Sequence, residues 1–98
     1  MAFKIIYRKR FNKQLLSLLA YLENKWGRVV ADEFVDILIF KLSTLASQPN
    51  LGIRSEKLKD ARSILVTKYN RLIYKVTENS IIVLNLSDTR RHPKKNKY

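Results

Sequence analysis

Hydrophobic residues in the first half of the chain recur at intervals of three and four positions, in two successive blocks. The first block predicts an amphipathic helix whose apolar face carries Phe11, Leu15, Leu18, Leu19, Leu22 and Trp26. The second block predicts another helix with the apolar stripe Ala31, Val35, Leu38, Leu42 and Leu45. Gly27 separates the two, and the second must end before Pro49, because proline disfavours a helical residue ahead of it. The pattern predicts an antiparallel helical hairpin.

Alternating apolar and polar residues, typical of strands, occur on both sides of the predicted hairpin. They predict a short first strand carrying Phe3, Ile5 and Tyr7, and three later strands at residues 62–67, 71–77 and 81–87. The turns between the later strands are short and polar, which implies antiparallel pairing, and the segment 49–61 is predicted to be a loop. We therefore expect one domain, residues 1–98, with an α+β fold. It would contain an N-terminal strand, an antiparallel helical hairpin and a three-stranded antiparallel meander.

The middle strand of this meander has two different faces. Leu72, Tyr74 and Val76 alternate with Arg71, Ile73, Lys75 and Thr77. Successive side chains of a strand point to opposite sides of the sheet, so the two sets are separated. We expect the first set to pack on the helices and the second to form an open, basic face.

Net charge narrows the classes of partner. The 98 residues include 20 Lys and Arg against 8 Asp and Glu, a formal charge of +12. Such an excess favours a polyanionic partner, whether a nucleic acid, an acidic protein or an anionic membrane. No apolar run approaches the roughly 20 residues needed to span a bilayer, and no secretory signal is visible, so we expect a cytoplasmic protein. With no Cys and one His, we expect neither a metal site nor a cofactor.

Cations on the expected open face are candidates for binding phosphate. They are Arg62, Arg71 and Lys75 on the strands, and Arg90 and Arg91 in the basic C-terminal tail, residues 88–98. A planar guanidinium group donates two parallel hydrogen bonds to a phosphate group. Cleavage of RNA would also require proton transfer, for which His92 and Tyr98 are the nearby candidates. His92 is the better candidate chemically, because imidazole titrates near neutral pH.

The second predicted helix carries more apolar residues than its single stripe. The additional ones are Phe34, Ile37, Ile39 and Phe40. Exposed apolar surface of this kind usually marks a protein interface. The alternative is that the helix lies deep and that these side chains are buried, and the pattern leaves both readings open.

Residues 21–52 and 69–93 resemble the ParE/RelE toxins of bacterial type II toxin–antitoxin modules, and the hairpin is most similar to the ParE branch. The resemblance rests on Tyr21, Trp26-Gly27, Ala31, Phe34, Leu45-Ala46, Pro49 and Gly52, followed by the Arg-bearing strand and the Arg-Arg segment. It implies a small, basic, growth-arresting toxin of the kind associated with plasmid stabilization. It also implies a cognate antitoxin that forms a hetero-oligomer with the toxin, with an antitoxin helix lying on Phe34, Ile37 and Phe40.

The same resemblance implies one of two activities, so whether the chain is an enzyme stays open. ParE-like members inhibit DNA gyrase without catalytic residues, whereas RelE-like members cut mRNA in the ribosomal A site. In the RelE-like case the catalytic residues would be Arg71, Arg91, His92 and Tyr98. The lysines that RelE-like enzymes carry on the preceding strand are largely missing, with Ile64 and Val66 in their place and only Arg62 as a substitute. We expect ParE-like inhibition of gyrase, with the ribosome-dependent endoribonuclease as the alternative and a non-toxic nucleic-acid-binding module as a further one.

Overall fold

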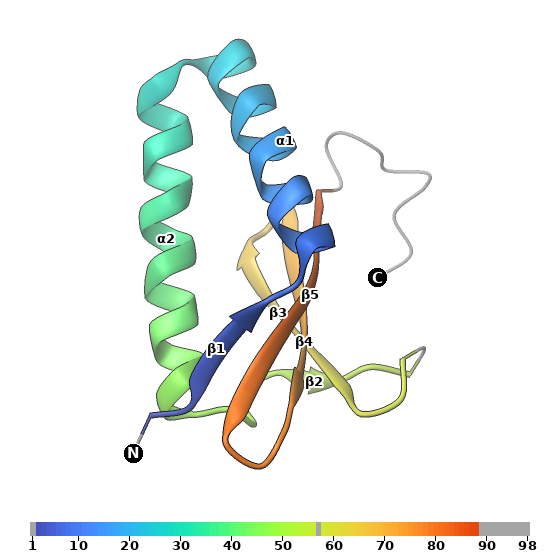
Figure 1. The fold of residues 1–98 in the computed structure, drawn as a ribbon. Coiled ribbons are helices and arrows are strands. Elements are labelled where there is room, and N and C mark those ends of the chain that lie inside the picture. The colour runs from blue at the N-terminus through green and yellow to red at the C-terminus, as the bar shows by residue number, and fades with distance from the viewer. Residues whose placement is uncertain (1, 57, 89–98) are drawn as a thin grey trace.

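The computed structural model describes residues 2–56 and 58–88, which form a helical hairpin packed on a five-stranded sheet (Figure 1). In chain order the elements are β1 (Lys4–Tyr7), α1 (Lys9–Trp26), α2 (Arg28–Ser47), β2 (Ile53–Arg54), β3 (Ala61–Thr67), β4 (Asn70–Val76) and β5 (Ser80–Asp88). The strand order in the sheet is β1-β5-β4-β3-β2. The predicted α+β class, with an N-terminal strand, a helical hairpin and a later meander, is confirmed.

Two details of the sheet differ from the prediction. The segment expected to be a loop contains β2, which pairs antiparallel with β3 through Ile53 and Ser63. At the opposite edge of the sheet from β2, β1 pairs in parallel with β5. The first pair in this register is Lys4 with Ser80. A parallel pair needs a long crossover connection, and the helical hairpin provides much of it.

Gly27 joins the two helices in a backbone conformation that suits glycine. Its φ of 96° and ψ of 169° lie in a region that is essentially restricted to residues without a Cβ atom. Its N–H donates to the carbonyl of Glu23 at 2.8 Å, and its carbonyl accepts from the N–H of Ala31 at 3.4 Å. One residue therefore ends α1 and begins α2, as the sequence predicted.

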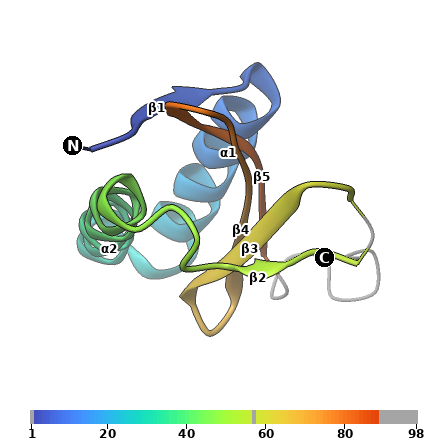
Figure 2. The same cartoon turned by 90° about the horizontal axis from the view of Figure 1, so that it is seen from below.

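The core lies between the hairpin and one face of the sheet (Figure 2). Its buried side chains include Phe11, Leu18, Leu22, Phe34, Leu38, Leu42, Leu45, Val66, Leu72, Tyr74, Ile81, Val83 and Leu86. Leu72 and Tyr74 lie on this side of β4, as predicted. The other side of β4 is less open than we expected, since Ile73 is only 1% exposed. That face is polar at Arg71 and Lys75 and has a buried apolar residue between them.

The edge of β5 is closed by two different elements. β1 pairs with the first part of β5, from Ser80 to Val83. Further along, Gln14 of α1 accepts a hydrogen bond from the N–H of Leu86 at 2.7 Å and donates to Oδ1 of Asn85 at 3.3 Å. A buried N–H without a partner costs about 1–3 kcal/mol, so Gln14 stabilises the position of α1 beside the sheet.

Candidate functional site

The loop that follows α2 is fixed to the sheet by Tyr74 and Arg62. The Tyr74 hydroxyl accepts from the N–H of Gly52 at 2.8 Å and donates to the carbonyl of Pro49 at 2.9 Å. The Arg62 guanidinium donates to the carbonyls of Gly52, at 2.8 Å, and Asn50, at 3.3 Å. Burial raises the pKa of Tyr74, although the Gly52 N–H and the charge of Arg62 oppose the rise. The hydroxyl therefore keeps its proton at neutral pH and can donate it to Pro49.

Arg62 consequently lies on the other side of the sheet from Arg71 and Lys75, in contrast to the single basic face that we expected. In the strand register Arg62 stands opposite Tyr74, whereas Arg71 stands opposite Leu65. Directly opposite residues of an antiparallel pair share a face, and positions along one strand alternate. Arg62 is thus on the face of Tyr74, and Arg71 and Lys75 share the opposite face.

Arg71 lies half-buried on the sheet face away from the hairpin. Its Nη1 atom donates to Oγ of Ser63 at 3.0 Å. Its cross-strand neighbours are Leu65 on β3 and Ser87 on β5. Among the described residues, these neighbours offer no group that titrates near neutral pH. The other predicted members of this group, Arg90, Arg91, His92 and Tyr98, fall outside the described residues.

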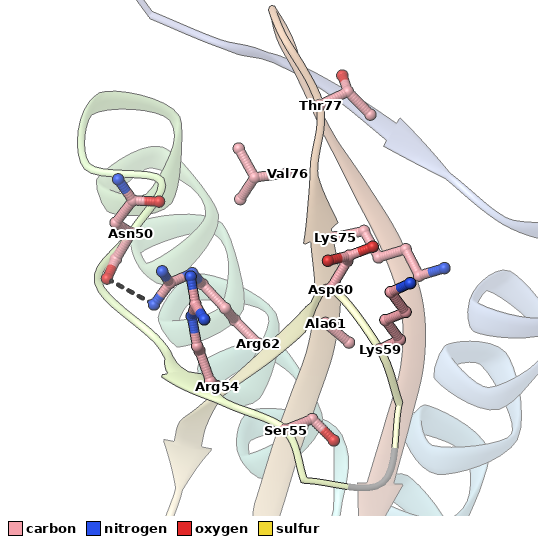
Figure 3. Close-up of a pocket in the computed structure, with 10 residues that line it drawn as sticks. All are labelled: Asn50, Arg54, Ser55, Lys59, Asp60, Ala61, Arg62, Lys75, Val76 and Thr77. Carbon is pink, nitrogen blue, oxygen red and sulfur yellow. Dashed lines mark hydrogen bonds between the residues drawn. The ribbon is translucent and has the colours of Figure 1, made fainter.

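A second group of cations lines a hollow of about 650 Å³ at the β2 edge of the sheet, where β3 begins and β4 ends (Figure 3). The charged residues of this basic hollow are Arg54, Lys59, Asp60, Arg62 and Lys75. Figure 3 shows Arg54 and Arg62 side by side, with Lys59 and Lys75 on the other side and Asp60 between the pairs. The sequence identified Arg62 and Lys75 as candidates but missed the other two cations. Arg54 and Lys59 lie in the segment predicted to be a loop, which carries no periodic signal.

α2 exposes apolar side chains on its side away from the core. We call Val29, Ile37 and Phe40, which are 71%, 40% and 68% exposed, the hairpin patch. Phe34, on which the resemblance placed an antitoxin helix together with Ile37 and Phe40, is only 4% exposed and belongs to the core. It stands four positions before Leu38, and this spacing places both on the same side of the helix. Of the two readings that the pattern left open, exposure therefore holds for Ile37, Ile39 and Phe40, and burial holds for Phe34.

A membrane-spanning helix or a cluster of metal ligands would each point to a different kind of function. Neither helix within residues 2–56 and 58–88 has the length and apolar character required to cross a bilayer. No cluster of three or more His, Asp or Glu side chains in this part of the chain could hold a metal ion. The surroundings of Arg71, the basic hollow and the hairpin patch are three candidate sites in this part of the chain.

Comparison with known proteins assigns this fold to a class. The family model described as the ParE toxin of the type II toxin–antitoxin system parDE matches residues 5–93. A match over nearly the whole chain, together with the hairpin-on-sheet architecture, defines a toxin of a type II toxin–antitoxin system. The chain belongs to the ParE toxin family.

Solved structures with the same fold come from both branches of the superfamily. The chromosomal ParDE system of P. aeruginosa matches with a TM-score of 0.76 and 13% identity, covering 89% of this chain and 96% of that chain. A mutant of the E. coli toxin RelE in the free state matches with a TM-score of 0.61 and 20% identity, covering 95% of this chain and 90% of that chain. The RelBE2 toxin–antitoxin complex from Mycobacterium tuberculosis matches with a TM-score of 0.61 and 15% identity, covering 90% of this chain and 99% of that chain. At these identities the likeness shows the fold. No curated protein matches the chain.

Proposed function

We propose that this toxin acts in the cytoplasm and arrests growth by inhibiting DNA gyrase. The observation that supports inhibition over RNA cleavage is the chemistry around Arg71. Cleavage of RNA needs groups that accept and donate protons beside the reacting phosphate. Within residues 2–56 and 58–88, Arg71 contacts Ser63 and lies between Leu65 and Ser87, and none of these three side chains titrates near neutral pH. An inhibitor that acts by binding needs no such groups.

The alternative function is ribosome-dependent cleavage of mRNA. It is favoured by Arg71 itself, a guanidinium on the middle strand of the sheet face away from the hairpin, held at 3.0 Å from Ser63. In that case Arg91 would stabilise the developing charge, and His92 or Tyr98 would transfer the proton. These three residues fall outside the described part of the chain, so the alternative depends on where they lie.

The proposed partner is a cognate antitoxin that packs an amphipathic helix against the hairpin patch. The P. aeruginosa ParDE and M. tuberculosis RelBE2 structures are toxin–antitoxin systems. In this chain Ile37 and Phe40 lie three positions apart on α2 and are 40% and 68% exposed. Exposed apolar residues at this spacing offer anchor points for a helix laid along the hairpin. Toxin and antitoxin would form a hetero-oligomer in which the patch is covered.

A supercoiling assay and primer extension, run in parallel, separate the two activities. We expect the purified toxin to block supercoiling at a stoichiometric ratio to gyrase, and the antitoxin to restore it. Transcripts in cells that express the toxin should stay intact while growth stops. Normal supercoiling combined with A-site cuts that disappear in Arg71→Ala would replace gyrase inhibition with RNA cleavage. Arg28→Ala, at the exposed hairpin turn, is the control and should behave as wild type in both assays.

A further inference from the structure

We propose that the basic hollow binds the phosphodiester backbone of a nucleic acid, at a site separate from the surroundings of Arg71. Lys75 in the hollow and Arg71 are four positions apart on β4, which corresponds to about 13 Å along a strand. The hollow is therefore a second contact region at the other end of the strand. This proposal goes beyond inhibition of gyrase and does not depend on it.

The pairing of Arg54 with Arg62 across two strands favours a bound anion. They stand directly opposite each other on β2 and β3. Like charges at such a cross-strand position destabilise a sheet, and a carboxylate at position 54 would pair with Arg62 instead. The stability of the strand pair therefore does not explain the second arginine. An anion bound between the two guanidinium groups would remove their repulsion.

Arg62 is also held in place before any ligand binds. Its Nη1 atom donates to the carbonyls of Gly52 and Asn50, which leaves the donors on Nε and Nη2 for a ligand. The side chain of Arg54, by contrast, makes no hydrogen bond or ion pair with another side chain or carbonyl among residues 2–56 and 58–88. One fixed and one adjustable guanidinium, side by side in Figure 3, suit the oxygens of a phosphate group.

Lys59, Asp60 and Lys75 set the charge of the other side of the hollow (Figure 3). Asp60 has a φ of 62°, the left-handed conformation with which the loop turns into β3. Its carboxylate offsets one of the four cations, so the lining keeps a net charge of +3. This is more than a single phosphodiester group requires. It suits a backbone that passes through the hollow with successive phosphates.

The uncharged lining favours a nucleic acid over an acidic peptide. It consists of Asn50, Ser55, Ala61, Val76 and Thr77. Peptide grooves rely on apolar or aromatic anchors, and the largest apolar side chain here is Val76. Hydroxyl and amide side chains, by contrast, commonly contact phosphate oxygens. The chemistry is shared by DNA and RNA.

Fluorescence anisotropy of the full chain with labelled oligonucleotides tests the proposal. The probes are single-stranded DNA, RNA of the same sequence and duplex DNA, each titrated over a range of salt concentrations. The test variant Arg54→Gln/Lys75→Gln spares Arg62, which holds the loop. The control variant Lys25→Gln/Arg28→Gln removes the same charge at the hairpin turn, at the other end of the molecule (Figure 1). We expect the test variant to bind about tenfold more weakly, with a salt slope lower by about two, and the control to change far less.

The anisotropy titrations give different results depending on whether the hollow binds a nucleic acid. Equal weakening in both double variants would overturn the proposal, because binding would then follow total charge. It would also be overturned if a glutamate-rich peptide of equal charge bound the chain and none of the oligonucleotides did. Similar affinity for DNA and RNA supports recognition of the shared backbone, and a preference identifies which nucleic acid is bound.

If the double variant melts at a lower temperature than the control, Lys75→Gln alone should still weaken binding about threefold. Gyrase is absent from this assay, so its result and that of the supercoiling assay are independent.

Discussion

The hydroxyl oxygen of Tyr74 lies 2.8 Å from the backbone nitrogen of Gly52, 22 positions earlier in the chain, and accepts its hydrogen bond. A Cβ atom on Gly52 would lie 2.6 Å from the same oxygen. The contact therefore exists only because position 52 has no side chain. The carbonyl of Pro49 accepts from the same hydroxyl at 2.9 Å. The close approach of the Tyr74 hydroxyl gives a physical reason for glycine at position 52.

Tyr74→Phe should lower the free energy of unfolding by about 1–3 kcal/mol, because the buried N–H of Gly52 and the carbonyl of Pro49 would lose their shared partner. Urea denaturation monitored by circular dichroism measures the change. Tyr7→Phe is the matched control, because the side chain of Tyr7 is 45% exposed and the change there should stay within about 0.5 kcal/mol. Equal losses in the two variants would show that the hydrogen bonds of Tyr74 to Gly52 and Pro49 do not stabilise the fold.

Stability should also fall in alkaline solution through Tyr74. Burial raises its pKa above the usual value of 10.0, so above that pH the unfolded chain loses the proton before the folded chain does. The contribution of the Tyr74 hydroxyl to the free energy of unfolding is complete below pH 10 and is lost as the pH rises through the folded-state pKa. Urea denaturation from pH 8 to pH 11 should show a decline that is shallower in Tyr74→Phe than in wild type. Identical pH dependence in the two proteins would contradict the assignment.

Gly52→Ala should destabilise the protein by about 1–3 kcal/mol, because the new methyl group would press on the Tyr74 ring and on the carbonyl oxygen of Ser63, 2.9 Å away. The double variant Gly52→Ala/Tyr74→Phe also removes the Tyr74 hydroxyl oxygen, which would be the atom nearest to the new methyl group. Its total loss should be smaller than the sum of the two single losses by at least about 0.5 kcal/mol. Strictly additive losses, measured in the same urea titrations, would mean that the two residues are not coupled.

Gly27→Ala should cost about 1–3 kcal/mol for a different reason. A Cβ atom there would meet nothing within 4 Å, so the whole cost would come from the backbone φ of 96°. Asn24→Ala, on the exposed side of the last turns of α1, is the control and should change stability little. Thermal melts that show no loss for Gly27→Ala would mean that the interhelical turn adapts to an ordinary conformation.

Phe40→Ser should weaken binding of the antitoxin about 30-fold or more, if the hairpin patch is its anchor. Stability of the free toxin should hardly change, because Phe40 is 68% exposed. Ile39→Ser is the control, since Ile39 is 59% exposed and points about 100° away around the helix. Isothermal titration of toxin with antitoxin gives the affinities. Similar losses for the two variants would place the antitoxin elsewhere on α2.

Local patterns in the sequence predicted the elements and several of their orientations. Spacing by three and four identified both helices, Gly27 marked their junction, and alternation placed Leu72 and Tyr74 on the covered side of β4. These features depend on contacts within one element or one turn, so a short stretch of sequence contains the information. Alternation also placed Arg71 and Lys75 together on the face away from the hairpin, while their role in binding phosphate stays a prediction.

Only the tertiary structure decided which surfaces are covered and which cations meet. Periodicity places Phe34 and Phe40 on different sides of α2, but it does not say that Phe34 is in the core and Phe40 outside it. The position of Arg62 opposite Arg54 depends on the register of β2 and β3, two segments joined by a loop without periodicity. Residues far apart in sequence become neighbours through strand pairing and layer packing, and no local pattern encodes those distances.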